Sequence, residues 1–98
     1  MSAEPAELHS TIEMLRAAYP SGLEDAEFHP LVAILAEEGG MSERNVASAL
    51  AALTGRGAQE LAYLVRISLE LEKPSDLQKE SVRRRLREHG FDVWINED

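Results

Sequence analysis

Cysteine is absent from the 98-residue chain, and aromatic residues make up only 5% of it. Without cysteine the chain can form neither a disulfide framework nor a thiolate metal site. With so few aromatic rings, the core must be built from leucine, valine, isoleucine and alanine, which supply most of the 44% apolar content. These features are typical of one small globular domain, and we expect residues 1–98 to form it.

Long apolar runs are missing as well. No stretch approaches the roughly 20 apolar residues that a transmembrane helix needs. The acidic, proline-containing start of the sequence, MSAEPAE, does not resemble a basic and apolar signal peptide. The sequence therefore predicts a cytoplasmic protein without a membrane segment, and it predicts flexible ends at residues 1–4 and 96–98.

Basic side chains are scarce outside one segment. The formal net charge is −8, and residues 1–72 hold 12 acidic but only 4 basic side chains. Residues 73–90 reverse the balance, with 6 basic and 3 acidic side chains. Because most nucleic-acid affinity comes from neutralising phosphates, a chain this acidic is not expected to bind DNA or RNA.

Apolar periodicity and helix-stop signals predict five helices. Leu8, Ile12, Leu15 and Tyr19, for example, are spaced by four, three and four residues and form one stripe of a first helix. Residues 21–27 are predicted to be a loop. The five helices are expected to begin at Pro5, Pro30, Ser42, Ala58 and Asp76, and to end before Pro20, Gly39, Gly55, Lys73 and Gly90.

The segment Ala58–Leu71 is apolar over most of a helical circumference, apart from one narrow polar stripe. A helix of this kind must be enclosed by several neighbours, so we expect it at the centre of the bundle, with Leu64 and Val65 in the core. Residues 65–71 also alternate apolar and polar, which is the period of a strand. Periodicity alone leaves helix and strand both open for these residues.

The last third of the chain has clear boundary signals. Ser75 and Gln78 match the capping-box pattern, which predicts a helix from Asp76. Its apolar side is expected to consist of Leu77, Val82 and Leu86. The following tail is too apolar to extend into water, so we expect it to pack on the bundle and shield Trp94. In the competing interpretation, the tail stays exposed and binds a partner.

No arrangement of residues in the sequence predicts catalysis. The three histidines, His9, His29 and His89, lie on separate segments and match no Ser/His/Asp, Cys/His or H-E-x-x-H pattern. His9 and Glu13 are four residues apart and could share a metal ion, but the sequence nominates no further ligands. His29, directly before Pro30, is interpreted as a loop residue at a helix start. We expect neither an enzyme nor a metal or cofactor site.

The arginine cluster in residues 83–87 is the only basic patch. On a helix Arg83 and Arg87 share one side, whereas Arg84 can pair with Glu80 and Glu88 at i, i+4 spacing. The cluster is expected to compensate the acidic part of the molecule, and in the functional alternative it docks an acidic partner protein. The candidate partner-binding residues are therefore Arg83, Arg87 and Trp94.

Residues 31–53 have the outline of a helix-turn-helix. The second helix would then read bases from its N-terminal part, with Arg44, Asn45 and Ser48 as candidate nucleic-acid-binding residues. No lysine or second arginine supports them there. An ordinary pair of antiparallel helices is therefore the favoured interpretation.

Short motifs over about residues 8–95 resemble, in order, a family of small actinobacterial domains of unknown function. The motifs are Ile12-Glu13-x-Leu15-Arg16-Ala17-x-Tyr19-Pro20-x-Gly22, Phe28-x-Pro30-Leu31-x-Ala33-x-Leu35, Pro74-x-Asp76-Leu77, and Val82-Arg83-x-Arg85-Leu86 with Gly90 behind. The resemblance implies an all-α, five-helix bundle, with residues 65–71 helical, and supplies no catalytic residues. The chain departs from the family in lacking an aspartate at the start of the fourth helix and in carrying an extra glycine before Met41.

The sequence as a whole predicts an all-α, single-domain five-helix bundle. Its expected function is that of a non-enzymatic module that binds another protein, itself a monomer or a weak homodimer. The alternative function is a helix-turn-helix-like nucleic-acid-binding or regulatory protein. The identity of a partner does not follow from the sequence.

Overall fold

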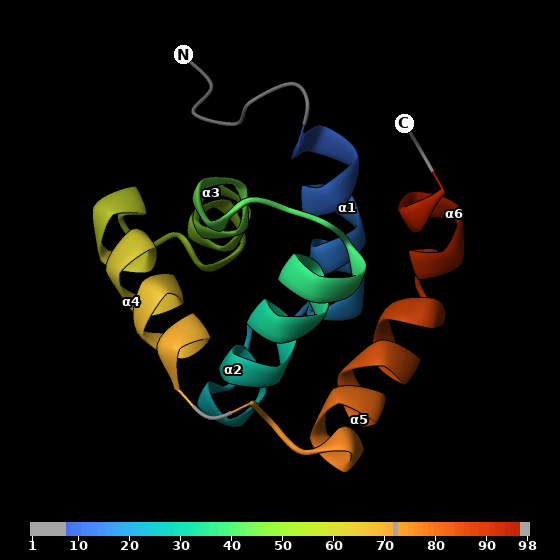
Figure 1. The fold of residues 1–98 in the computed structure, drawn as a ribbon. Helices are drawn as coiled ribbons and strands as arrows, with labels where there is room; N and C mark the ends of the chain where they lie inside the picture. Colours follow the sequence, from blue (N-terminus) through green and yellow to red (C-terminus); the bar gives the residue numbers. More distant parts are fainter. Residues whose placement is uncertain (1–7, 72, 97–98) are drawn as a thin grey trace.

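The computed structural model describes residues 8–71 and 73–96, and its regular structure is helical (Figure 1). Within these residues there is no strand, which confirms the all-α prediction and the helical assignment of residues 65–70. The predicted helix start at Pro5 and most of the predicted flexible ends lie outside the described residues. The helices are α1 (His9–Ala18), α2 (Asp25–Ala33), α3 (Glu43–Thr54), α4 (Ala58–Glu70), α5 (Asp76–Arg87) and the short α6 (Phe91–Ile95).

Helix α2 lies at the centre of the bundle. It continues into one turn of π-helix, η2 (Ile34–Glu38), and it packs against α4 on one side and α5 on the other (Figure 1). The five successive residues 31–35 are each at most 4% exposed. Five consecutive residues point in all directions around a helix, so this segment is enclosed on every side.

Helix α4, which we expected at the centre, lies instead at the edge of the bundle, and that prediction is wrong. Only Leu61, Val65 and Ser68 are buried along its length, whereas Leu64 is half-buried and Tyr63 is 65% exposed. A domain of this size has too few helices to enclose two of them. Part of the apolar surface of α4, including Tyr63 and Leu69, is therefore left in contact with solvent.

The second helix begins earlier than predicted. Proline is favoured in the first turn of a helix, which placed the start at Pro30. In the structure the helix starts at Asp25, and Pro30 lies inside it as a buried residue. A proline at this position removes one backbone hydrogen bond, to the carbonyl of residue 26, and the burial of its ring among the core side chains offsets part of that loss.

Several predicted helix boundaries are confirmed by their caps. The Ser42 hydroxyl accepts a hydrogen bond from the Asn45 N–H at 3.1 Å at the start of α3. At the start of α5 the backbone N–H of Ser75 donates to the Gln78 side chain at 2.9 Å, and the Gln78 N–H donates to the Ser75 hydroxyl at 3.1 Å. This is the predicted capping box, and it satisfies two backbone donors at the helix start.

The predicted apolar side of α5 needs one correction. Val82 and Leu86 are buried, but Leu77 is 84% exposed. Five residues separate Leu77 from Val82, which is about 140° around a helix, so the two side chains point to nearly opposite sides. The spacing itself therefore excludes Leu77 from the core.

The C-terminal tail packs on the bundle, as predicted. It forms α6, in which Phe91 is buried and its ring centroid lies 5.7 Å from that of Trp94. The Trp94 indole N–H donates a hydrogen bond to the Thr11 hydroxyl of α1 at 2.7 Å. Val93, at 71% exposed, points away. The tail is therefore fixed to the bundle by the buried Phe91 ring and by the hydrogen bond from Trp94 to α1.

The glycine pair after η2 serves two different purposes. Gly40 has a φ of 66°, a left-handed conformation that glycine adopts without a steric penalty. Gly39 instead lies under the Trp94 ring, where a Cβ atom would come within 2.6 Å of a ring carbon and 2.7 Å of the Leu35 carbonyl oxygen. The ring of Trp94 can occupy its place only because residue 39 has no side chain.

We expect Gly39→Ala to destabilise the protein by about 1–3 kcal/mol, because the added methyl group displaces the Trp94 ring. The free energy of unfolding from denaturant titration measures the loss, and Trp94 fluorescence reports the displacement. Gly57→Ala is the control: a Cβ there meets no atom within 4 Å and its φ is −66°, so Trp94 fluorescence should not change, although alanine at this N-cap of α4 costs some stability. Unchanged Trp94 fluorescence in Gly39→Ala would contradict the packing of Trp94 on Gly39.

Candidate interaction surfaces

Arg83 pairs with two carboxylates, one from η2 and one from its own helix. Its Nε donates to both carboxylate oxygens of Glu38 at 3.0 and 3.1 Å, and its terminal nitrogens bond Glu38 and Glu80. The Arg83 side chain is only 19% exposed. These contacts join α5 to the end of η2. They also use the guanidinium group of Arg83, which the sequence predicted to bind a partner.

The Arg83–Glu38 contact shifts the pKa values of both groups. The hydrogen bond from Arg83 lowers the pKa of Glu38 below its ordinary value of 4.5, against the opposing effect of burial. The same hydrogen bond raises the pKa of Arg83. Both groups are therefore charged at neutral pH.

Arg85 holds together three parts of the bundle. One terminal nitrogen donates to both oxygens of Glu27, at 2.9 and 3.1 Å, and the guanidinium lies 4.5 Å from the centre of the Tyr19 ring. Tyr19 is 2% exposed, and its burial, together with the neighbouring carboxylate of Glu27, raises the pKa of the phenol. The contact links α5, the first turn of α2 and the end of α1.

Arg84 and Arg87 remain more open to solvent. Arg87 lies 3.7 Å from the Asp92 carboxylate of α6. The predicted pairs of Arg84 with Glu80 and Glu88 do not form, and Glu80 bonds Arg83 instead. Within residues 8–71 and 73–96, Arg84 is the arginine of α5 that has no ion-pair partner.

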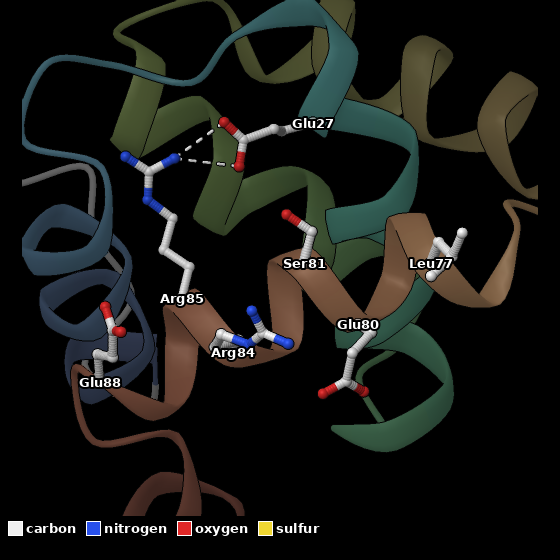
Figure 2. Close-up of a pocket in the computed structure, with 7 residues that line it drawn as sticks. All are labelled: Glu27, Leu77, Glu80, Ser81, Arg84, Arg85 and Glu88. Carbon is white, nitrogen blue, oxygen red and sulfur yellow. Dashed lines mark hydrogen bonds and ion pairs between the residues drawn. The ribbon is translucent and has the colours of Figure 1, made fainter.

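The outer side of α5 forms a shallow hollow of about 520 Å³, which we call the α5 surface (Figure 2). Its floor runs along α5, and Glu27 of α2 closes one side through its pair with Arg85 (Figure 2). The hollow combines an almost fully exposed leucine, Leu77, with the unpaired guanidinium of Arg84. The lining residues are Glu27, Leu77, Glu80, Ser81, Arg84, Arg85 and Glu88.

The residues predicted to read nucleic acid lie at a second depression, the α3–α4 groove, of about 570 Å³. Arg44 and Ser48 line it, whereas Asn45 is half-buried beside the cap of α3. Arg66 of α4 donates to Glu43 of α3 at 3.2 Å across the groove. The lining residues are Glu43, Arg44, Ala47, Ser48, Ala58, Gln59, Ala62 and Arg66.

A partly buried contact between His29 and Ser68 was not predicted from the sequence. The Nδ1 atom of His29, which lies within α2 rather than in a loop, is 2.5 Å from the hydroxyl oxygen of Ser68 on α4. Ser68 is 4% exposed, and with His29 it lines a small cavity of about 40 Å³. Leu61, Val65 and Ser68 are spaced by four and three residues and are the buried positions of α4. A buried serine needs a hydrogen-bond partner, so a serine at this spacing was the signal in the sequence that could have predicted the contact.

The remaining histidine prediction concerns His9, which could share a metal ion with Glu13. His9 lies 3.1 Å from Glu13, one helical turn away, and both side chains are about two-thirds exposed. Within the part of the chain that the structure describes, no three histidine, aspartate or glutamate side chains gather closely enough to hold a metal ion. This range also contains no helix that is both long enough and apolar enough to cross a membrane.

Comparisons with models of protein families, with curated proteins and with solved structures find no match to this chain. The resemblance to small actinobacterial domains of unknown function therefore stays a prediction. The function has to be argued from the surfaces themselves.

The ion pair between Arg83 and Glu38 gives a prediction with a definite pH dependence. A carboxylate whose pKa is lowered in the folded state stabilises the fold above its unfolded pKa, and this contribution is lost as the pH falls through the folded pKa. Glu38→Gln should therefore lower the free energy of unfolding by about 1–3 kcal/mol at pH 7. The difference from the wild type should shrink as the pH falls below about 4.

Denaturant titrations of both proteins across this pH range provide the measurement. Glu60→Gln is the matched control, because Glu60 pairs with Arg56 at the surface, where both side chains are about half exposed. That substitution should cost well under about 1 kcal/mol at every pH. An effect of Glu38→Gln that is equally small, or that grows in acid, would contradict the role given to this ion pair.

Proposed function

We propose that this chain is a cytoplasmic, non-enzymatic module that binds another protein through the α5 surface. The observation that carries the proposal is the presence of Leu77, 84% exposed, and the unpaired Arg84 in one hollow. Single exposed leucines are common, but here an apolar side chain and an uncompensated charge lie together. The module itself is proposed to be monomeric or weakly dimeric.

Binding of a partner at this surface would remove the Leu77 side chain from water and give Arg84 an ion-pair partner. Removing a leucine side chain from water contributes roughly 1.5–3 kcal/mol. A carboxylate on the partner would supply the ion pair that Arg84 lacks, and the exclusion of water by the neighbouring contact would strengthen that pair. The other α5 arginines contribute less, because Arg83 and Arg85 already bond carboxylates of this chain.

A binding role fits the chemistry of the α5 surface better than a catalytic one. Two of its three carboxylates are already in ion pairs, Glu27 with Arg85 and Glu80 with Arg83. Both carboxylates are held in ion pairs with guanidinium groups, whereas a general acid or base must be free to contact a substrate. The groups in this hollow are suited to recognition.

Nucleic-acid binding by Arg44, Asn45 and Ser48 stays a prediction that no observation favours. The whole chain carries a net charge of −8, which repels phosphates, and Glu43 beside Arg44 is paired with Arg66 across the groove. If this alternative holds, affinity for a DNA duplex should fall steeply with salt and fall further on Arg44→Ala.

The proposed surface can be tested by a pair of matched double variants. Leu77→Asp with Arg84→Glu changes the α5 surface, whereas Tyr63→Asp with Arg56→Glu makes the same kind of change on and beside α4. Both pairs alter one exposed apolar residue and one exposed arginine, with the same change in net charge. Circular dichroism and denaturant titration should show both variants folded, because none of the four side chains is buried.

We expect the wild type and the α4 variant to retain the same proteins from a lysate of the native cells, as measured by quantitative mass spectrometry. The α5 variant should lose them by about tenfold or more, and a purified partner should show the same difference in Kd. Equal retention by the two variants, or loss confined to the α4 variant, would contradict the proposal. Retained nucleic acid in place of protein would reverse the ranking of the two functions.

A further inference from the structure

We infer that the segment bound at the α5 surface is an amphipathic helix that presents an apolar side chain and one carboxylate two turns apart. This inference rests on the proposed function and adds the chemistry of the partner. It follows from the shape of the hollow, from the lack of a sheet edge among the described residues and from the charges that line the hollow.

The shape of the hollow favours a helix lying along α5. Leu77, Ser81 and Arg84 are spaced by four and three residues, so they form one straight stripe on the outer side of α5. Leu77 and Arg84 are seven residues apart, which is about 10 Å along the axis. Ser81 between them is small and lets a second helix approach closely. A partner helix matches this stripe with side chains at the same spacing.

A partner peptide in the extended conformation would have no strand with which its backbone could form hydrogen bonds in the described part of the chain. Peptides in the extended conformation gain affinity by adding a strand to the edge of a sheet. Within residues 8–71 and 73–96 there is no strand, and the backbone groups of α5 are used inside the helix. Recognition here must therefore use side chains, which is how a helix binds in a groove.

The charges of the hollow select a single carboxylate. Glu27 and Glu80 are neutralised by Arg85 and Arg83, which leaves Arg84 as the positive charge to be matched. Glu88, one turn beyond Arg84, repels any further anion along the same line. A polyanion such as nucleic acid is therefore disfavoured, and a helix with one aspartate or glutamate on its apolar side fits.

Two synthetic helical peptides provide the test. Each is about 18 residues long, or five turns, and alanine-rich. In the matching peptide a leucine and a glutamate are seven residues apart on one side. The control peptide has the same composition, but its glutamate is five residues from the leucine and points about 140° away. Binding is followed by the amide chemical shifts of the isotope-labelled full chain.

We expect the matching peptide to shift the amides of Leu77, Ser81 and Arg84 and to bind about fivefold more tightly than the control peptide. Arg84→Glu should remove this advantage. A peptide in which lysine replaces the glutamate should regain it on the Arg84→Glu protein, because the charges are exchanged. Arg56→Glu, outside the hollow, should leave the preference unchanged.

The inference is overturned if the two peptides bind alike, if neither binds, or if the shifts fall on other helices. This failure can be told apart from failure of the proposed function. When the peptides fail but protein capture still depends on Leu77 and Arg84, the surface binds a protein of another shape. When capture does not depend on them either, the proposed function fails too.

Discussion

The burial of residues 31–35 in α2 and η2 is the constraint on which the rest of the fold depends. Leu31, Val32, Ile34 and Leu35 are each fully buried, and taking such a side chain out of water contributes roughly 1.5–3 kcal/mol. Because these residues face every direction, the segment is stable only when helices surround it. Helices α4 and α5 are held on opposite sides of α2 for this reason, and their outer faces are left to solvent (Figure 1).

Much of the fold could be predicted from local signals, and the errors arose where packing decides. The helix starts at Ser42 and Ser75 depend on hydrogen bonds between neighbours in sequence, so residue types were enough. The centre of the bundle depends on how many helices are available to cover each one. The uninterrupted apolar run of residues 31–35 was the better signal for enclosure than the broad but alanine-containing apolar arc of α4. This signal was overlooked because Pro30, directly before the run, indicated the start of a helix.

The candidate surface was less predictable than the fold, because its charges are set by contacts distant in sequence. Arg83 pairs with Glu38, which is 45 residues away in the sequence, and Arg85 pairs with Glu27, which is 58 residues away. Sequence spacing predicted only pairs within α5. These contacts take two arginines out of the patch and leave Arg84 as the one to bind. The exposure of Leu77 could have been foreseen from its five-residue distance to Val82. Ion pairs between residues distant in sequence depend on how the helices pack, so residue spacing does not predict them.

Native-state hydrogen exchange tests the central position of α2 most directly. The amide protons of residues 31–35 should be the slowest to exchange in the chain, with an opening free energy equal to that of global unfolding. Those on the outer side of α4, near Tyr63, should exchange through smaller local openings. If the slowest amides lie in α4 instead, while those of α2 exchange through partial unfolding, the bundle is organised around α4 and this account of the fold is wrong.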